Sequence, residues 1–265
     1  MIIETIRSTY QTIQIVERNG VRFMRFGDER AGWQGAMLVR RPTRLYFPYQ
    51  QAFALHTMWL PSVSRFLAVG IGTGTAISHV HRRHPQARIT GIDVDAAVMV
   101  AAKEHFMMPA DDRTRFIEAD ARAFVPRMED QFDLILLDVF YREETPQTFF
   151  SPVYLRSLAD RLTPGGVLAM NVILPTAGEH SRKFWELGRR LSLLIGPAWY
   201  IPLGVISFSA QNIVLFSQRD PTVTAPVSQL RRRGLREIGA HQRMFARYAQ
   251  LLPWRLKPFR TNPDN

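Results

Sequence analysis

The chain contains no cysteine, which excludes disulfide bonds and thiolate metal sites. It also has no run approaching the ~18 consecutive apolar residues that a membrane-spanning helix needs. The first residues lack the basic-then-apolar order of a signal peptide, because an acid, Glu4, comes early. Together these absences predict a cytoplasmic protein without a transmembrane segment.

Several catalytic and metal-binding patterns are missing as well. The sequence has no internal repeat, no Ser-His-Asp signature and no lysine-bearing phosphate loop. Three histidines, His79, His81 and His84, fall within one predicted helix, but no acid is in register to complete a metal site. We therefore expect surface histidines and no bound metal.

Acidic residues are outnumbered: 23 Asp and Glu face 34 Lys and Arg, nearly all of them arginine, for a net charge of +11. Most of the excess follows residue 224, where nine basic residues stand against only Glu237 and Asp264. A solvated basic helix docked on the domain explains this segment, and contact with a membrane or nucleic acid is the alternative. Residues 223–265 are therefore predicted to form a basic helical tail that can contact an anionic surface.

The chain is organised around a glycine turn. A short buried strand at residues 66–69 runs into Gly70-Ile71-Gly72-Thr73-Gly74, and a helical pattern begins at Thr75. Glycines let the backbone turn sharply and let a ligand approach the amides, while the helix start offers partial positive charge. The next strand ends in Asp93, where a carboxylate can hold ribose hydroxyls. This combination predicts a nucleoside site.

Around that turn the pattern of apolar residues predicts an α/β fold. The first sixty residues are β-rich, with a hairpin at Asn19-Gly20, and from Arg65 onward strands and helices alternate. This alternation predicts a Rossmann-like, doubly wound and mostly parallel sheet, closed by an antiparallel pair near 199–203 and 212–217. We divide the chain into a β-rich lead-in and loop at 1–62, a nucleoside-binding catalytic domain at 63–222 and the tail. The expected strands are 66–69, 88–92, 114–118, 132–137 and 167–173, and the expected helices are 75–84, 96–106, 121–128, 152–162 and 180–195.

Three predicted strands lead into an aspartate: Asp93, Asp120 and Asp138. Ligands of such sheets bind beyond the carboxyl ends of the strands, so these side chains share one rim with the glycine turn. Each aspartate alone could be a helix N-cap. Jointly they indicate a site, because buried unpaired carboxylates are costly.

These residues resemble the spermidine synthase family, aminopropyltransferases related to class I methyltransferases. The likeness runs from about Ser8 to Ser217, and Ser8-Thr9-Tyr10-Gln11 is similar to that family's opening, where the glutamine contacts the nucleoside. Tyr49-Gln50-Gln51 resembles its Tyr-[His/Gln]-Glu element near the transferred group. The resemblance implies a class I methyltransferase fold, a small-molecule acceptor such as an amine, a homodimer, and catalysis by Asp138 with Tyr49 beside it. It also implies S-adenosylmethionine or its decarboxylated form as cofactor, bound by Gln11, Gln50, Gly70, Gly72, Thr73, Gly74, Asp93, Asp120 and Ala121.

Three departures from the family pattern remove carboxylates. Thr73 stands where the family's glycine turn has an aspartate, and Gln51 stands where its Tyr-x-Glu element has the acid. The run Asp138–Arg142 lacks the second acid of the family's Asp-Ser-x-Asp-Pro, and the spacing of Glu143 and Glu144 does not match it. Each missing carboxylate would pair with an ammonium group, so doubly charged putrescine should bind poorly.

We therefore expect a transferase that uses a sulfonium cofactor and has a spermidine-synthase-like fold. The departures favour a methyltransferase-like activity slightly over true aminopropyl transfer. A catalytically silent protein that binds a nucleoside is a third alternative. In either enzyme, Asp138 would orient or deprotonate the acceptor.

Overall fold

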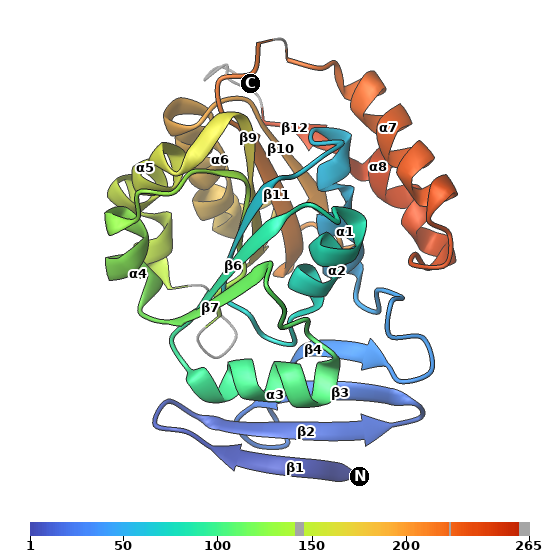
Figure 1. Ribbon diagram of the computed structural model, residues 1–265. Coiled ribbons are helices and arrows are strands. Elements are labelled where there is room, and N and C mark those ends of the chain that lie inside the picture. Colours follow the sequence, from blue (N-terminus) through green and yellow to red (C-terminus); the bar gives the residue numbers. More distant parts are fainter. Residues whose placement is uncertain (141–145, 223, 260–265) are drawn as a thin grey trace.

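Eight strands form one sheet at the centre of the molecule: β5 (Arg65–Val69), β6 (Arg88–Asp93), β7 (Thr114–Glu118), β8 (Phe132–Leu137), β9 (Leu162–Leu174), β10 (Ala198–Pro202), β11 (Gln211–Gln218) and β12 (Lys257–Pro258) (Figure 1). The computed structural model describes residues 1–140, 146–222 and 224–259. Strands β7, β6, β5, β8 and β9 pair in parallel, and β9, β11, β10 and β12 continue the sheet antiparallel. The predicted doubly wound, mostly parallel sheet with a closing antiparallel pair is confirmed.

Helices cover both faces of the sheet, because successive residues of a strand point to opposite sides. On β5, Phe66 and Ala68 pack into one layer, whereas Leu67 and Val69 pack into the other, and all four are buried. Figure 1 shows these two layers on either side of the strands. One layer contains α1 (Pro48–Ala54), α2 (Thr75–Arg83) and α7 (Val227–Ala240), and the other contains α4 (Ala121–Phe124), α5 (Pro152–Asp160) and α6 (Arg182–Leu194).

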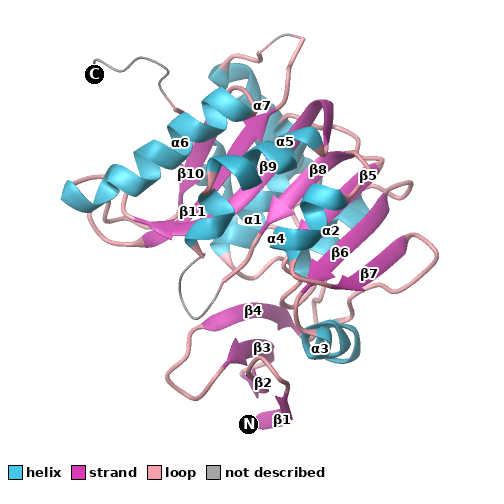
Figure 2. Ribbon diagram, turned by 90° about the vertical axis from the view of Figure 1, so that its left-hand side faces the viewer, coloured by secondary structure: helices cyan, strands magenta, loops and turns pink. Residues whose placement is uncertain are grey.

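A second, four-stranded sheet precedes the main one in sequence: β1 (Ile2–Arg7), β2 (Thr12–Arg18), β3 (Val21–Phe26) and β4 (Trp33–Leu38). Its strands pair antiparallel in sequence order, and β2 turns into β3 through Asn19 and Gly20, both with positive φ. The predicted hairpin is therefore confirmed. Figure 2 shows α3 (Ala96–Phe106) beside this sheet, and the two share a core of Ile13, Met24, Phe106 and their neighbours.

The junction of α5 and β9 differs from the prediction. The helix expected at 152–162 ends at Asp160, and the strand expected at 167 begins at Leu162. Leu162 already pairs with Phe132, and a bulge containing Pro164-Gly165-Gly166 follows before the regular pairing resumes at Val167. The glycines thus lie inside a strand, because strand pairing starts immediately after the helix.

The expectation of surface histidines is wrong for two of the three. His79 and His84 are 1% and 5% exposed, because their rings face α1 and the segment after it within the same layer: His79 lies against Phe53, and both lie against His56. His84 Nε2 lies 3.0 Å from Nε2 of a further buried histidine, His56. Only His81 faces outward, where its Nε2 is 2.7 Å from a carboxylate oxygen of Asp111. Burial lowers the pKa of His56 to about 3 and that of His84 to about 4, so both rings are neutral.

The C-terminal segment is docked on the main sheet rather than free. Helix α7 buries Leu230 and Ile238, and η5 (Arg247–Leu251) and α8 (Leu252–Arg255) continue the same core. Several of its arginines donate to main-chain carbonyls: Arg231 to Leu256, Arg233 to Met58 and Arg255 to Leu203. These arginines therefore stabilise the docked segment, in addition to contributing to its positive charge. None of the helices in the described ranges combines the length and the apolar composition needed to cross a membrane.

Candidate active site

A cleft of about 1080 Å³ opens at the carboxyl ends of the parallel strands. It is bounded by the glycine turn after β5, by Asp93 at the end of β6, and by residues that follow β7 and β8. The lining includes eight residues of the predicted site: Gln11, Tyr49, Gly70, Gly72, Asp93, Asp120, Ala121 and Asp138. Sequence positions far apart thus meet at one rim, as the strand ends predict.

The three glycines of the turn have different surroundings. All have positive φ, at +86° for Gly70, +52° for Gly72 and +67° for Gly74. A Cβ would collide with the Asp138 carbonyl at Gly70 and lie 2.5 Å from Met108 Sδ at Gly74, but would meet nothing within 4 Å at Gly72. Gly72 therefore faces open space in the cleft. Gly74 is not among the described residues that line the cleft, and its positive φ together with the packing of Met108 explains glycine there.

Asp93 is held against the glycine turn. Its Oδ2 accepts a hydrogen bond from the Ile71 amide at 2.9 Å, and its Oδ1 accepts one from the Asp95 amide at 3.1 Å. Burial raises the pKa of the Asp93 carboxyl. Each oxygen keeps a lone pair for a further donor, such as a sugar hydroxyl.

The N-terminal sheet reaches this rim through the next aspartate. Asp95 Oδ2 accepts hydrogen bonds from Ser8 Oγ at 2.6 Å and from Gln11 Nε2 at 3.4 Å. Gln11 is therefore fixed at the edge of the cleft, beside Asp93. Its predicted contact with the nucleoside stays a prediction.

Asp120 combines the two roles that the sequence left open. Its carboxylate caps α4 by accepting from the Arg122 amide at 2.9 Å, and it also lines the cleft. Arg122 Nη2 donates to it at 2.7 Å, and this side-chain bond lowers the pKa of Asp120. The acid is consequently ionised at the mouth of the cleft, next to Ala121.

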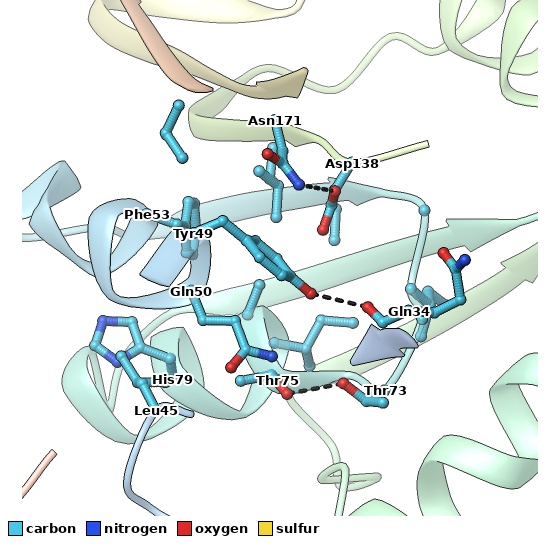
Figure 3. Close-up of a pocket in the computed structure, with 18 residues that line it drawn as sticks. Gln34, Leu45, Tyr49, Gln50, Phe53, Thr73, Thr75, His79, Asp138 and Asn171 are labelled. Atoms are coloured by element: carbon cyan, nitrogen blue, oxygen red, sulfur yellow. Dashed lines mark hydrogen bonds between the residues drawn. The ribbon is translucent and has the colours of Figure 1, made fainter. Parts of the chain in front are cut away.

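Asp138 lies at the inner end of the cleft in a different environment. Its Oδ1 accepts a hydrogen bond from Asn171 Nδ2 at 3.0 Å, and burial raises the pKa of the carboxyl to about 6 (Figure 3). Tyr49 faces it, and its hydroxyl donates to the Gln34 carbonyl at 2.9 Å. Burial and then the Asp138 charge raise the pKa of Tyr49, while the nearby Gln50 side chain opposes the shift. A carboxyl poised near pH 6 can accept a proton from an acceptor at neutral pH.

A smaller inner pocket of about 30 Å³ continues from the cleft past Tyr49. It shares Gly70, Gly72 and Asp138 with the cleft, and Gln50 and Thr73 of the predicted site line it from the other side. The Thr73 hydroxyl lies 2.8 Å from that of Thr75. The turn therefore presents a neutral side chain here, without an added charge.

Asn171 and His79 are among the residues of this pocket that sequence reasoning missed. Asn171 orients Asp138, but it lies on β9 and no local pattern marks it. His79 lines the pocket from α2. His79 follows Ala76 by three residues, so it lies on the predicted apolar face of that helix. This spacing could have predicted that His79 is buried.

Gln51 does not belong to the candidate site, so its comparison with the acid of an amine site is wrong. Gln51, read as a lost acid of the amine site, is fully buried and is not among the described residues that line either pocket. Its Nε2 donates to the Leu45 carbonyl at 3.2 Å and to the Tyr248 hydroxyl at 2.6 Å, while its Oε1 accepts from the Ala246 amide at 3.0 Å. It ties α1 to the C-terminal segment. The predicted loss of a second acid falls within residues 141–145, outside the described residues.

Metal ligands gather at one place in the described ranges, away from the residues that line the cleft. Glu4, Glu104 and His105 lie together where β1 meets α3. His105 Nε2 is already 2.6 Å from a Glu4 carboxylate oxygen, so a surface hydrogen bond accounts for the group.

Comparisons with known proteins agree with this geometry. Residues 66–166 match a family model described as a methyltransferase domain. A polyamine aminopropyltransferase of Vibrio vulnificus is 27% identical over 175 residues, which cover 64% of this chain and 58% of that protein. An eEF1A lysine and N-terminal methyltransferase homolog of Drosophila melanogaster is 29% identical over 116 residues, covering 40% of this chain and 17% of that protein. The chain thus spans little more than half of the first relative and a smaller part of the second.

Solved structures share the fold at low sequence identity. A probable spermidine synthase from Corynebacterium glutamicum superimposes with a TM-score of 0.75 at 19% identity, covering 88% of this chain and 86% of that one. Human methyltransferase-like protein 13, solved with SAH, has a TM-score of 0.58 at 21% identity, covering 73% and 88%. The predicted Rossmann-like methyltransferase fold and the resemblance to spermidine synthases are both confirmed.

Proposed function

We propose that this chain, a divergent spermidine-synthase-like member of the methyltransferase fold, transfers an alkyl group from an adenosyl sulfonium cofactor to a small-molecule acceptor. The observation that carries the proposal is the continuity of one cleft, which joins the glycine turn and Asp93 to the buried Asp138. Two structural neighbours support the choice of cofactor: one spermidine synthase was solved with the transition-state analogue AdoDATO, and the human methyltransferase-like protein with SAH.

The residues present fit such a cofactor. Gly72 leaves open space for a close approach to the backbone, and Asp93 keeps lone pairs for ribose hydroxyls. Asp120 and Ala121 would lie on the adenine side, and Gln11 at the edge of the nucleoside. The cofactor supplies an alkyl group activated by its bond to a positively charged sulfur.

The protein's own contribution is alignment and a proton acceptor. Walls that fix the acceptor beside the cofactor can supply ~7–11 kcal/mol of the barrier reduction. Asp138, oriented by Asn171, would take the proton that an amine or hydroxyl acceptor loses, a role worth ~10²–10⁴-fold in rate. The raised pKa of its carboxyl suits that role near neutral pH.

Methyl transfer is our first choice and aminopropyl transfer the second. The neutral Thr73 favours the former, because a cationic aminopropyl end would find Asp138 as the one carboxylate among the described lining residues of the inner pocket. The polyamine aminopropyltransferases of Vibrio vulnificus and Chromobacterium violaceum among the relatives favour the latter. A silent nucleoside-binding protein is the third candidate.

Calorimetric titration with S-adenosylmethionine, its decarboxylated form and methylthioadenosine tests the cofactor. Turnover with a panel of small amines then separates the activities, because methyl transfer releases S-adenosylhomocysteine and aminopropyl transfer releases methylthioadenosine. Failure of all three ligands to bind would refute the proposal. Binding without turnover of any acceptor would favour the silent alternative.

Three further predictions from the sequence extend the proposal. They are a homodimer, a cytoplasmic location, and contact between the basic tail and an anionic surface. The last would use those arginines of α7 that remain exposed, such as Arg232 and Arg236.

A further inference from the structure

The inner pocket contains polar atoms that the protein itself leaves without partners. Within the described part of the chain, Gln50 Nε2, both ring nitrogens of His79 and Asn171 Oδ1 are buried and have no hydrogen-bond partner. All three side chains are less than 5% exposed, and all line this pocket. Buried polar groups are nearly always hydrogen-bonded, so several unpartnered ones around one pocket point to a ligand group that completes them.

The orientation of the Gln50 amide is fixed. Its Oε1 accepts hydrogen bonds from the Tyr46 amide at 3.2 Å and from the Phe47 amide at 3.0 Å, which caps the start of α1. If the Gln50 amide were flipped, its NH₂ group would face the backbone N–H groups of Tyr46 and Phe47, which are also donors. Nε2 must therefore be the atom on the pocket side. Gln50 therefore offers donors and no acceptor to a ligand.

His79 adds a second donor under positive charge. Burial lowers the pKa of its ring well below the usual value, so the imidazole is neutral, with one N–H donor and one acceptor nitrogen. No hydrogen bond among the described residues fixes which nitrogen carries the proton, so either can donate to a ligand. The charged or titratable neighbours that act on it are His56, Arg82, His84 and Arg83, in that order after burial, and all favour a neutral ring. A negative group beside His79 would be attracted by Arg82, and a positive one repelled, whereas the charge of Arg83 is already paired with Glu237.

The two ends of the pocket thus differ in chemistry. Figure 3 shows Asp138 and Asn171 at one end and Gln50 and His79 at the other, with the Tyr49 ring between them. The first end offers acceptor oxygens, and the second offers donors. The donor end lies beside the glycine turn, since Thr73 and Thr75 line the pocket there.

We propose that Gln50 and His79 are specificity-determining residues that receive a carboxylate at the end of the sulfonium cofactor's side chain. The inference rests on the proposed function and goes beyond it, because it selects S-adenosylmethionine over its decarboxylated form. The lone ammonium of the decarboxylated form carries donors only, so it would face the N–H groups of Gln50 and the positive charge of Arg82 near His79. Attraction of the S-adenosylmethionine carboxylate and repulsion of the lone ammonium both favour S-adenosylmethionine.

The test compares three ligands on matched variants by calorimetry. Gln50→Glu keeps an oxygen for the two capping amides and replaces the donor with a carboxylate oxygen. His79→Leu removes both nitrogens, and Gln131→Glu and His81→Leu make the same exchanges at positions that do not line either pocket. Methylthioadenosine lacks the end group, so its affinity reports an intact nucleoside site in each variant.

The expected result is that the wild type binds S-adenosylmethionine ~10-fold or more tightly than the decarboxylated form. Gln50→Glu should abolish or invert this preference, and His79→Leu should weaken S-adenosylmethionine alone, while both controls keep the wild-type ratio. Equal affinities in the wild type, or a preference that survives Gln50→Glu, overturn the inference and leave the proposed function standing if methylthioadenosine binds. If the wild type binds none of the three ligands, the proposed function itself is refuted.

Discussion

Replacing Asp138 by asparagine should stabilise the protein at neutral pH while removing its transfer activity. The carboxyl is buried, and its Oδ1 accepts from Asn171 Nδ2 at 3.0 Å. An asparagine at position 138 keeps an oxygen for that bond and carries no charge to desolvate. The variant therefore separates the cost of the buried charge from its use in catalysis.

The magnitude follows from the pKa. Burial raises the pKa of Asp138 from 3.8 to about 6, which corresponds to ~3 kcal/mol of stability linked to protonation. Between these values the folded protein keeps a proton that the unfolded chain has released, so the free energy of unfolding falls as pH rises. The contribution is fully present below about pH 4 and lost above about pH 6.

Urea unfolding of both proteins at pH 4.5 and 7.5 is the assay. The variant's unfolding free energy relative to wild type should rise by ~2 kcal/mol between the two pH values. Asp120→Asn is the matched control, because Arg122 lowers the pKa of Asp120 below its ordinary value of 3.8. Any linked stability of Asp120 is lost only at pH values below that, so the relative stability of this variant should not change between pH 4.5 and 7.5. A relative stability of Asp138→Asn that does not change with pH would refute the reasoning, and full activity in that variant would remove Asp138 from the mechanism.

Three other changes test the rest of the molecule. Asp93→Ala should weaken methylthioadenosine binding by ~1–3 kcal/mol in calorimetry, the usual loss for a charge-assisted bond; unchanged affinity in a folded variant would remove the nucleoside site. Gly74→Ala should lower the urea midpoint more than Gly72→Ala, because a Cβ at Gly74 meets Met108 Sδ at 2.5 Å and one at Gly72 meets nothing within 4 Å; equal losses would contradict this. Truncation after Thr224 should cause unfolding or aggregation, because α7 belongs to the core; a soluble product with an unchanged melting temperature would show instead that the tail is an accessory.

Local pattern predicted those parts of the fold that depend on local chemistry. The glycine turn, the alternation of strands and helices, and the Asn19-Gly20 hairpin each follow from backbone preferences and apolar periodicity. The start of β9 could not be predicted in this way. Leu162 joins the strand because it pairs with Phe132, thirty residues earlier, and strand pairing is not visible in a local window.

The candidate site shows the same division. Asp93, Asp120 and Asp138 were recognised because the carboxyl ends of parallel strands meet at one edge. The burial of His79 and His84 depends on what packs over α2, namely η1 (Leu55–Met58) and α1, and their sequence spacing alone does not reveal that cover. Asn171 acts through a contact between two strands, so only the assembled sheet identifies it.

Gln51 shows why a missing acid is not by itself a change of substrate. Its Nε2 donates to the Leu45 carbonyl, and its Oε1 accepts from the Ala246 amide, so this position needs both a donor and an acceptor. A glutamate could not donate to the buried Leu45 carbonyl, and its charge would lie far from water. The docked C-terminal segment therefore explains glutamine here without reference to any amine. Thr73, Gln50 and His79 leave one end of the inner pocket without a carboxylate, whereas Asp138 lies at the other end. Because Gln50 Oε1 is fixed by the cap of α1, Gln50→Glu adds a negative charge to the first end with the least change in its shape.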